Sequence, residues 1–481
     1  MYSNKIQRFN PKGFTTNGAK MTDTSTSKSR SGPMVLVSKG IEFTFPLGYA
    51  YLAGYLKQRG EDVRVVFKRQ DAVGLVNEIM SLNPVLVGFG SLYPELKETG
   101  DLITMLNQAG RKFPIVIGGQ MVTPTPEFAV KVSGADYGII GEGEITLHSL
   151  VTAIREGRDI SSIRGLVIRR GDEVINTGHG ECIENLDNLP PVPYEMFPTE
   201  KWLPIGLWYA KNCPQPHWKI EDRVINVHGG RGCPFKCNFC YHHSKPRYRS
   251  IEVMMNEAQA ALKRFNGNML YFSDDLVLAS PKRARELVDH IRKLDRPVNY
   301  SITARFDILA RIDDALLGEM KETGLRIVGL GIESGSDRML EIIGKNCTAA
   351  TIRSELSRLK RFDIMPTVTI MLGQYTETVE DVEMSIDLMR DTVRENPLIN
   401  YVFTVTTPFP GSKLYDLIMQ QGVLRDDQHF YDIYFSAGGG DFKQIVNLSA
   451  ISGEKLGKLY QKINRVYQEE KTRSVRAGSA V

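Results

Sequence analysis

Residues 231–241 read Arg-Gly-Cys-Pro-Phe-Lys-Cys-Asn-Phe-Cys-Tyr and contain three of the six cysteines of the chain, Cys233, Cys237 and Cys240. The segment follows an apolar run at 224–228 that is typical of a buried strand, and glycines at positions 229, 230 and 232 open the loop. Three thiolates on one short loop suit a soft-metal centre, and iron–sulfur clusters are held in this way. Three ligands leave one iron of a four-iron cluster open, as a substrate-binding metal site requires.

Two simpler interpretations of this loop compete with a cluster. The first is a structural zinc site with His242 or His243 as the fourth ligand, although zinc ligands usually come as two spaced pairs. The second is a loop with incidental free thiols. The density of cysteines in the loop favours the cluster.

The spacing Cys-x3-Cys-x2-Cys, with an aromatic residue after the last cysteine, resembles the signature of the radical S-adenosylmethionine (radical SAM) superfamily. The resemblance implies that Cys233, Cys237 and Cys240 are the catalytic ligands of a [4Fe-4S] cluster whose open iron binds SAM. It also implies that Tyr241 lies against the adenine. In that superfamily an electron from the cluster cleaves SAM, and the resulting 5′-deoxyadenosyl radical abstracts hydrogen from an unactivated carbon.

The overall composition is that of a water-soluble globular protein. The chain has 481 residues, enough for two or three domains, with 42% hydrophobic and 24% charged residues. Its net charge of +4 arises from 60 bases and 56 acids without a dense basic tract, so we expect no nucleic-acid partner. Six cysteines are no disulfide framework and indicate a reducing compartment. We see neither an apolar run of about 18 residues nor a signal peptide, and expect a cytoplasmic protein without a membrane span.

The first half of the chain predicts a Rossmann-like domain. Residues 1–33 are polar and are expected to form a flexible tail. Strand-like runs then alternate with helical patterns, which predicts a doubly wound parallel sheet in a domain at 34–180. These strands are expected at 34–37, 63–67, 85–90, 114–119 and 137–140. Ligands of such sheets bind at the carboxyl ends of the strands, where this chain has Ser91, Tyr93, Gly118, Gly119, Gln120, Gly141, Glu142 and Gly143.

This order of segments resembles the cobalamin-binding (B12-binding) domain that precedes the cluster domain in one large radical SAM class. The resemblance rests on Pro46-Leu47-Gly48, Gly118-Gly119 and Gly141-Glu142-Gly143-Glu144, and it implies that the residues at the strand ends bind cobalamin. The chain has no Asp-x-His-x-x-Gly motif to supply a cobalt ligand, and Gln120 stands where the class often has histidine. The alternative is a Rossmann-like domain that only packs against the barrel or helps to hold substrate.

The second half predicts a partial (β/α)6 barrel. A hairpin at 163–177 and a proline-rich linker at 181–222 precede it. In a domain at 223–422, strands are expected at 223–228, 268–273, 297–303, 325–331, 364–372 and 398–406. A cap over the barrel mouth and an amphipathic helix are expected at 423–481, where a small helical region ends the chain.

Polar residues at the barrel strand ends are candidates for SAM binding. Ser273, Asp274 and Asp275 close the second strand, and by the resemblance this position recognises the amino group of SAM, although either aspartate can also be a helix cap. Ser301 and Arg305 flank the third strand end, where the guanidinium would pair with the SAM carboxylate or form a surface ion pair.

Segments at the later strand ends also resemble those of the class. Glu333 and Ser334 end the fourth strand, and Glu333 would lie beside the cofactor, unless it is structural and paired with an arginine. The fifth segment departs from the family pattern, with Tyr375-Thr376 in place of proline-glycine, which would bring Tyr375 to the substrate. The proline and glycine at 410–411, after the sixth strand, shape a turn. Cys182, Cys213 and Cys347 are expected to be plain thiols, with a radical-donating or substrate-binding role as the alternative.

We therefore expect a radical SAM enzyme that, with cobalamin, methylates an unactivated carbon in a small metabolite or natural-product precursor. The reaction needs an electron donor such as flavodoxin or ferredoxin. The first alternative is a radical SAM cyclisation, rearrangement, dehydration or reduction in which the B12-type domain transfers no methyl group. The second alternative is a non-catalytic iron–sulfur or zinc protein.

Overall fold

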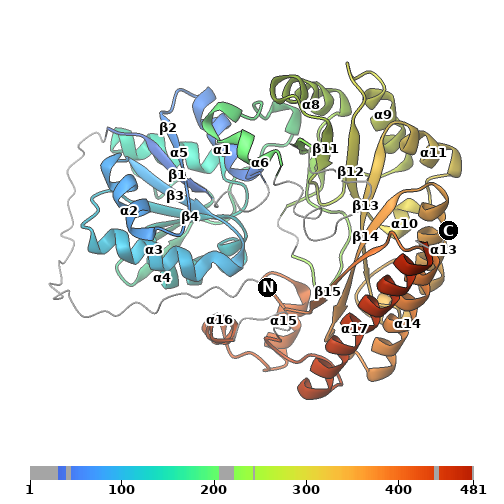
Figure 1. The fold of residues 1–481 in the computed structure, drawn as a ribbon. Helices are drawn as coiled ribbons and strands as arrows, with labels where there is room; N and C mark the ends of the chain where they lie inside the picture. Colours follow the sequence, from blue (N-terminus) through green and yellow to red (C-terminus); the bar gives the residue numbers. More distant parts are fainter. Residues whose placement is uncertain (1–30, 39–44, 205–221, 242–243, 438–443, 479–481) are drawn as a thin grey trace.

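The computed structural model describes residues 31–38, 45–204, 222–241, 244–437 and 444–478. Within these residues two α/β domains lie beside each other, the first coloured blue to cyan and the second green to red (Figure 1). Several sequence-based expectations lie outside the described residues: nearly all of the flexible tail, the linker at 205–221 with Cys213, the zinc-ligand candidates His242 and His243, and the glycine-rich part of the cap at 438–443.

The first domain is built on one sheet with the strand order β2-β1-β3-β4-β5-β6-β7. Its strands are β1 (Met34–Ser38), β2 (Val63–Phe67), β3 (Leu86–Gly90), β4 (Ile115–Gly118), β5 (Tyr137–Ile139), β6 (Leu166–Arg170) and β7 (Glu173–Asn176). The first five strands are parallel, as the sequence predicts. The predicted hairpin forms β6 and β7 and extends the same sheet in antiparallel pairing.

Helices cover both faces of this sheet. They are α1 (Leu47–Gln58), α2 (Ala72–Ser81), α3 (Leu96–Gln108), α4 (Pro126–Ser133) and α5 (Glu144–Glu156). Successive side chains of β1 point to opposite faces: Met34 packs in the core with α1 and α5, whereas Val35 packs in the core with α2, α3 and α4. Both faces of the sheet are therefore apolar, which explains the continuous hydrophobic runs in the sequence.

The predicted linker packs against the first domain over its described part. It contains η3 (Leu186–Asn188), η4 (Tyr194–Met196) and the short helix α6 (Thr199–Trp202). Leu189, Val192 and Trp202 are buried in the core beside α1. Because these side chains are anchored, the part of the linker before residue 205 is fixed to the first domain.

The second domain contains a six-stranded parallel sheet in the order β15-β14-β13-β12-β11-β8. Its strands are β8 (Val224–Val227), β11 (Met269–Phe272), β12 (Asn299–Ala304), β13 (Leu325–Glu333), β14 (Met365–Leu372) and β15 (Asn400–Val405). All six overlap the predicted strands. Among the described residues β8 and β15 do not pair with each other, so the barrel is partial, as expected.

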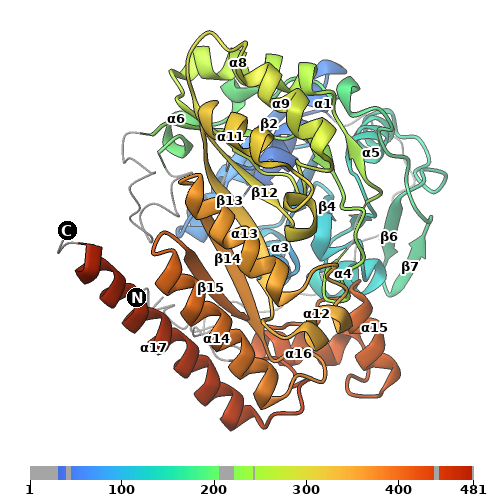
Figure 2. The same ribbon diagram turned by 90° about the vertical axis from the view of Figure 1, so that its right-hand side faces the viewer.

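Helices follow the strands of the barrel on its outer side, and α13 and α14 lie in front of the sheet in Figure 2. They are α8 (Ile251–Phe265), α9 (Pro281–Ile291), α10 (Phe306–Leu309), α11 (Asp314–Glu322), α12 (Asp337–Ile342), α13 (Ala349–Arg361) and α14 (Val379–Glu395). This arrangement places the carboxyl ends of the strands, with their polar side chains, at one end of the barrel.

The C-terminal region connects the two domains. It contains α15 (Lys413–Gln420), α16 (Asp427–Ser436) and α17 (Gly453–Gly478), which lies alongside α14 (Figure 2). Phe430 of α16 is buried in the same core as Tyr93 of the first domain. Arg394 of α14 and Glu470 of α17 form an ion pair with 2.7 Å between Nη2 and Oε1. The predicted amphipathic helix thus packs along the barrel.

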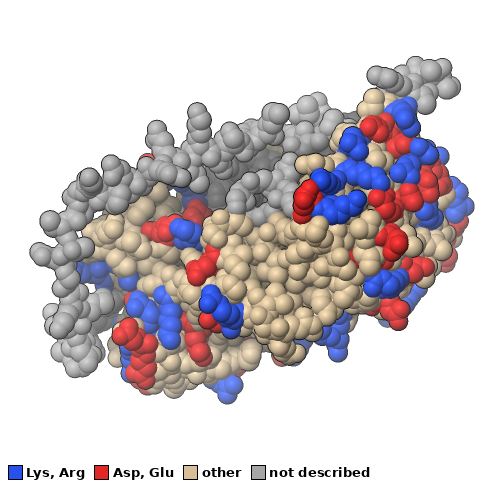
Figure 3. Space-filling model, turned by 90° about the horizontal axis from the view of Figure 1, so that it is seen from below, with Lys and Arg blue, Asp and Glu red and all other residues tan. Residues whose placement is uncertain are grey.

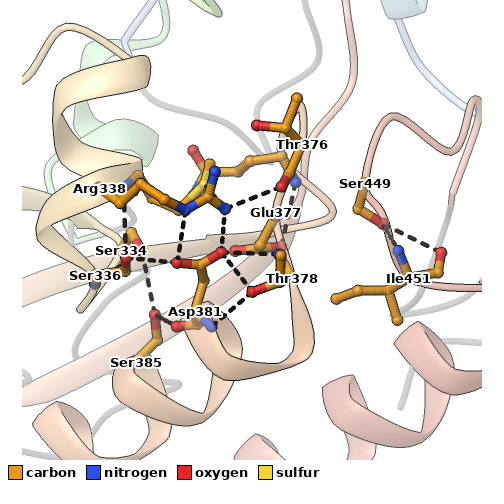
Figure 4. A network of polar contacts seen from close by, with 12 residues as sticks. Ser334, Ser336, Arg338, Thr376, Glu377, Thr378, Asp381, Ser385, Ser449 and Ile451 are labelled. Carbon is orange, nitrogen blue, oxygen red and sulfur yellow. Dashed lines mark hydrogen bonds and ion pairs between the residues drawn. The ribbon is translucent and has the colours of Figure 1, made fainter.

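A polar network joins the starts of α12 and α14 (Figure 4). Asp381 accepts hydrogen bonds from Ser336 Oγ (2.6 Å), from Thr378 Oγ1 (2.8 Å) and from the guanidinium of Arg338. Burial alone would raise the pKa of Asp381, but the hydrogen bonds from Arg338, Ser336 and Thr378 hold it well below its usual value. Asp381 therefore remains ionised, and its hydrogen bonds hold the starts of α12 and α14 together.

Charges of both signs are found on the face of the described residues that Figure 3 shows. On the face shown in Figure 3, basic and acidic side chains are interspersed, and a broad uncharged stretch lies between them. This agrees with the small net charge of +4. Among the described residues, no helix is long and apolar enough to cross a membrane.

Glu377 links the β14 loop to the following helix, and its ionisation makes folding stability depend on pH. Its Oε2 accepts hydrogen bonds from the backbone N–H groups of Gly373 (2.6 Å) and Gln374 (3.3 Å). Burial and, to a smaller extent, the charge of Asp381 raise the pKa of Glu377 from 4.5 to about 8 against these hydrogen bonds. Between these two values the folded chain holds a proton that the unfolded chain has lost. The stabilisation from this proton is complete at pH values below the unfolded-state pKa of Glu377. It is lost as the pH rises through the folded-state pKa.

We predict that Glu377→Gln removes this dependence, because glutamine is a neutral acceptor of the same shape. In the wild type, Glu377 should lower the free energy of unfolding by about 1.4 kcal/mol per pH unit within that window. Urea unfolding at about pH 5.5 and about pH 7.5 measures the difference. The exposed Glu380→Gln is the matched control and should keep the wild-type slope. Equal slopes in wild type and Glu377→Gln would contradict the prediction.

Candidate active site

A cavity of about 490 Å³ lies between the two domains; we call it the first cavity. From the first domain it is lined at the ends of β3, β4 and β5 by predicted cofactor-binding residues, namely Ser91, Gly118, Gly119, Gln120, Gly141, Glu142 and Gly143. From the second domain it is lined by His228, Arg231, Ser273 and Asp275, among others. The structure thus brings the carboxyl ends of both sheets to one space, where ligands of such folds bind.

The backbone at the strand ends of the first domain is shaped for close approach. Gly119 has a φ of +80°, and a Cβ at this position would lie 2.9 Å from the carbonyl oxygen of Ser91, so no other residue fits here without strain. The hydroxyl of Tyr49 lies 2.7 Å from the carbonyl oxygen of Val37 and 2.7 Å from the amide nitrogen of Gly90, and so holds the ends of β1 and β3 together. Sequence analysis did not identify Tyr49, because an apolar helix face gave no sign of a polar role.

A second cavity, of about 410 Å³, adjoins the first. The two cavities share Leu92, Gln120, Gly232 and Asp275 in their walls. The second cavity is lined by Cys233, Cys240 and Tyr241 from the cysteine loop, by Tyr93 and Pro94 from the first domain, and by Phe239, Phe409 and Pro410. Two of the three candidate cluster ligands, Cys233 and Cys240, and most of the candidate cobalamin residues therefore face two adjoining spaces, whereas the buried Cys237 lines neither.

The cysteine loop is closed at its base and anchored at its far side. The short strands β9 (Gly230–Arg231) and β10 (Arg247–Tyr248) pair in antiparallel fashion and close the loop. On the far side, the Asn238 amide nitrogen Nδ2 donates to the carbonyl of Ile342 (3.0 Å), and the amide of Leu414 donates to the carbonyl of Asn238 (2.9 Å). The loop is therefore fixed to α12 and α15 as well as to β8.

Of the three thiols of this loop, Cys237 is buried, Cys233 is partly exposed and Cys240 is exposed. Burial raises the pKa of Cys233. Cys237 is buried, and Nη1 of Arg305 lies 3.4 Å from its Sγ. Thiolates form in such a setting only with a compensating positive charge, and bound iron supplies that charge. The three side chains therefore fit a metal cluster.

Among the described residues, Cys233, Cys237 and Cys240 included, no three His, Cys, Asp or Glu side chains are gathered closely enough to hold one metal ion. The ligands of a four-iron cluster need not meet at one ion, because each binds a different iron. His242 and His243, considered above as zinc ligands, lie outside the described residues. Cys182 and Cys347 are free thiols of intermediate exposure that line neither cavity.

The residues after β11 have different surroundings. Asp274 is buried, and its Oδ1 accepts hydrogen bonds from the amides of Gly229 and Gly230, both at 2.7 Å. Burial raises its pKa to about 7 against these two hydrogen bonds. Asp274 thus shapes the start of the cysteine loop, whereas Ser273 lines the first cavity and the exposed Asp275 lines both cavities.

Arg305 lies beside the cysteine loop, and Ser301 lies apart from it. The guanidinium of Arg305 pairs with Asp307 at 2.8 Å and lies over the ring of Phe235 at 3.7 Å. Burial alone would lower its pKa, but Asp307 and Cys237 raise it. Ser301 lies within β12 and lines a separate small cavity of about 60 Å³ between the strands.

The fourth strand end is held by its own polar contacts. Glu333 has a φ of +65°, and its carboxylate contacts Lys345 Nζ (3.1 Å) and Thr369 Oγ1 (3.0 Å), so its partner is a lysine and not the expected arginine. Ser334 is fully buried beside Ser385 at 3.4 Å and lines neither cavity (Figure 4). Tyr375 also lines neither cavity, and its hydroxyl accepts a hydrogen bond from Gln421.

Tyr241 spans the two domains. Its ring lies against Gly411, where an added Cβ would come within 2.5 Å of the ring and where φ is +86°. Burial raises the pKa of Tyr241 to about 12, while a hydrogen bond with Thr123 of the first domain lowers it. The glycine of the Pro410–Gly411 turn is therefore required both by the backbone conformation and by the contact with Tyr241.

Four charged side chains tie the walls of the first cavity to the cysteine loop; we call them the interdomain ion cluster. Arg231 Nη1 lies 2.7 Å from Glu142 Oε2, and Arg231 Nη2 lies 2.5 Å from Glu144 Oε1. Arg247 pairs with the other oxygen of Glu142. Every one of the four side chains is at most 12% exposed. Glu142, predicted to bind the cofactor, thus holds the base of the cysteine loop while lining the first cavity.

Comparison with known proteins matches both halves of the chain to described families. Residues 34–151 match the family model "B12 binding domain", and residues 227–389 match the family model "Radical SAM superfamily". The chain belongs to the radical SAM enzymes that carry a B12-binding domain. This assignment brings a [4Fe-4S] cluster, SAM and cobalamin as the cofactors of the enzyme.

Individual relatives of this radical SAM enzyme are distant. It is 26% identical to an uncharacterised methyltransferase of Pyrococcus horikoshii over 388 residues, which are 79% of each chain. It is also 26% identical to an anaerobic magnesium-protoporphyrin IX monomethyl ester cyclase of Rubrivivax gelatinosus, over 77% of this chain and 65% of the cyclase. The structure of the radical SAM methyltransferase TsrM of Kitasatospora setae, with cobalamin and a [4Fe-4S] cluster, superposes with a TM-score of 0.65 and 18% identity, over 81% and 75% of the two chains. That likeness concerns the fold.

The residues of this radical SAM enzyme fit the cofactors of the family. The glycines at the strand ends leave the backbone of the first cavity open to a large ligand. Sequence analysis did not assign His228, Leu92, Phe239 or Phe409 to the site. Their positions follow from the packing of the two domains, which no local pattern reveals.

We predict that Arg231→Gln destabilises the enzyme by about 3–5 kcal/mol, because the buried carboxylate of Glu144 loses its partner and that of Glu142 keeps only Arg247. Adding Glu144→Gln should restore part of this loss, because one of those carboxylates is then neutral. Unfolding curves of the two single variants and the double variant measure the coupling. The control is Arg155→Gln, which breaks the Arg155–Glu61 pair within the first domain and should show a smaller loss, because that guanidinium is 25% exposed. The prediction would be contradicted if the double variant lost as much stability as the sum of the losses in Arg231→Gln and Glu144→Gln.

Proposed function

We propose that this enzyme is a cobalamin-dependent radical SAM methyltransferase that methylates an unactivated carbon of a small metabolite or natural-product precursor. The observation that carries the proposal is the common wall of the two cavities. Leu92, Gln120, Gly232 and Asp275 border both spaces, so a methyl carrier in the first cavity would adjoin the cluster side in the second. Direct transfer between two cofactors requires that they be neighbours.

In this proposal the chemistry supplied by the bound cofactors is reductive cleavage of SAM and transfer of a methyl group. The protein's residues bind these cofactors and hold them in position. Cys233, Cys237 and Cys240 would hold the cluster, with Arg305 close to Cys237 Sγ at 3.4 Å. Asp275, exposed to both cavities, would accept hydrogen bonds from the ammonium group of SAM. We assign Asp274 to the loop backbone instead, because its Oδ1 is already bound to two amides.

The remaining predicted residues receive different roles in this proposal. Tyr241 would flank the adenine while its hydroxyl stays on Thr123, and Ser273 would contact a ligand in the first cavity. Glu333 would support the barrel mouth through Lys345 rather than contact the ribose. Ser301 and Ser334 would have no contact with cofactors, because they line neither of the two cavities.

A second candidate is a radical SAM cyclisation, rearrangement, dehydration or reduction without methyl transfer. The 26% identity to an anaerobic magnesium-protoporphyrin IX monomethyl ester cyclase favours it. In that case the first cavity would hold cobalamin without methyl exchange or would hold part of the substrate. The two candidates differ in their products, because methyl transfer from SAM leaves S-adenosylhomocysteine.

The proposal also implies a cellular compartment for the enzyme and domain boundaries in the chain. An oxygen-poor cytoplasm would supply electrons through flavodoxin or ferredoxin. We propose the segments 34–180 for cobalamin and 223–422 for the radical SAM barrel. The two matched family regions, 34–151 and 227–389, lie within these segments.

Anaerobic purification with hydroxocobalamin, followed by cluster reconstitution and reduction with SAM, tests the proposal. We expect iron and cobalt in the protein, S-adenosylhomocysteine that depends on cobalamin, and 5′-deoxyadenosine that depends on reduction. Cys233→Ala, Cys237→Ala and Cys240→Ala should each lose iron and form no 5′-deoxyadenosine, because a cluster ligand is missing.

Cys347→Ala is the matched control, because this thiol is outside the motif and lines neither cavity. It should retain iron and SAM cleavage. Iron and 5′-deoxyadenosine without cobalt would favour the second candidate. Persistence of iron and SAM cleavage in the three motif variants would exclude both candidates.

A further inference from the structure

The side chain of Arg305 lies beside the cysteine loop in an arrangement that the cofactor assignment does not use. Arg305 lies between β12 and α10, and it lines neither of the two cavities. Its Nη1 donates a hydrogen bond to Sγ of Cys237, with 3.4 Å between the two atoms. Arg305 therefore approaches the loop at a candidate cluster ligand and away from the cavity walls.

The guanidinium of Arg305 is held so that Nη1 is directed at the sulfur. Asp307 binds the other two nitrogens, with 2.8 Å between Nε and Oδ1 and 3.4 Å between Nη2 and Oδ2. The guanidinium also lies over the ring of Phe235, 3.7 Å from the ring centroid, and Phe235 belongs to the cysteine loop itself. Because the planar group is fixed by a carboxylate and by a ring, its third nitrogen has one direction.

The contact between Arg305 and Cys237 is buried, which increases its electrostatic effect. The side chains of Arg305 and Asp307 are 11% and 7% exposed, and Cys237 is 7% exposed. A charge-assisted hydrogen bond is stronger in such a place than at the surface. In the part of the chain that the structure describes, no other Lys or Arg side chain donates a hydrogen bond to one of the three motif sulfurs.

We propose that Arg305 raises the reduction potential of the cluster through its hydrogen bond to Cys237 Sγ. This inference rests on the proposed function, in which Cys237 is a cluster ligand. Reduction adds one electron, and so one negative charge, to the cluster and its thiolates. A positively charged donor stabilises the reduced form more than the oxidised form, and hydrogen bonds to the sulfurs help to set the potential of such clusters. Arg305 acts through Cys237 and is a positioning residue.

A redox titration of the anaerobically reconstituted enzyme tests the inference. The electron paramagnetic resonance signal of the reduced cluster is followed as the potential is lowered. Arg305→Gln should lower the midpoint potential, because the reduced form loses its charged donor. We expect the equilibrium constant for reduction to fall about tenfold, which is about 59 mV for one electron. The iron content shows whether each preparation holds its cluster.

Two further variants separate the hydrogen bond from a simple change in charge. Arg305→Gln leaves the buried carboxylate of Asp307 unpaired, and that charge would itself lower the potential. The double variant Arg305→Gln/Asp307→Asn removes both charges of the pair and keeps the net charge of the wild type. Its potential should still lie below that of the wild type. Arg311→Gln is the control, because Arg311 is exposed just after α10 and its loss should leave the potential unchanged.

Three results would overturn the inference. The first is a potential in the double variant that equals that of the wild type. The second is loss of iron from both Arg305 variants, because Arg305 would then only hold the loop in place. The third is weaker binding of SAM at an unchanged potential, read from the change that SAM causes in the cluster signal, because Arg305 would then serve the carboxylate of SAM.

An assay of the same preparations for reductive cleavage of SAM separates this inference from the proposed function. If SAM is cleaved but the potential does not depend on Arg305, the inference alone fails. If the potential shifts as expected but SAM is not cleaved, the proposed function fails and the inference stands.

Discussion

The interdomain ion cluster is the contact on which the candidate active site depends. Two carboxylates at the start of α5 meet two guanidinium groups at the base of the cysteine loop, with 2.5 Å between Arg231 Nη2 and Glu144 Oε1. Ionic groups this deeply buried persist only when each has its partner. The cluster therefore fixes the loop that carries the thiols relative to the sheet that lines the first cavity. Other contacts, such as Tyr241 on Thr123 and α16 on Tyr93, add to the same arrangement.

The fold was predictable because it depends on patterns that are local in the chain. Apolar runs predicted the five parallel strands of the first sheet and the six strands of the barrel, and the largest shift at a strand boundary is two residues, as at β12 and β15. Both faces of the first sheet are covered by helices, so its runs are continuous and easily read. The hairpin was also predicted, but its place at the edge of the first sheet was not. Pairing between strands that are distant in the sequence produces no local sequence pattern.

The candidate site was less predictable because side-chain direction is set by packing. Asp274 and Asp275 are adjacent in the sequence, yet one is turned into the backbone of Gly229 and Gly230 and the other into the cavities. Ser301 was expected at a strand end and lies inside β12 instead. The motif at 141–144 indicated a ligand site, but nothing in it indicated that Arg231 and Arg247 would be its partners. The cysteine spacing, by contrast, needs no tertiary information to indicate a metal centre.

The central claim is that one chain holds its cobalt and iron–sulfur sites as neighbours across a common wall. Electron paramagnetic resonance of the enzyme loaded with both cofactors and reduced to cob(II)alamin and the paramagnetic cluster tests this claim directly. The account predicts that the two signals are broadened or split by mutual magnetic interaction, and that neither shows this when its partner is omitted. Each signal having the same shape with and without the other cofactor would contradict it.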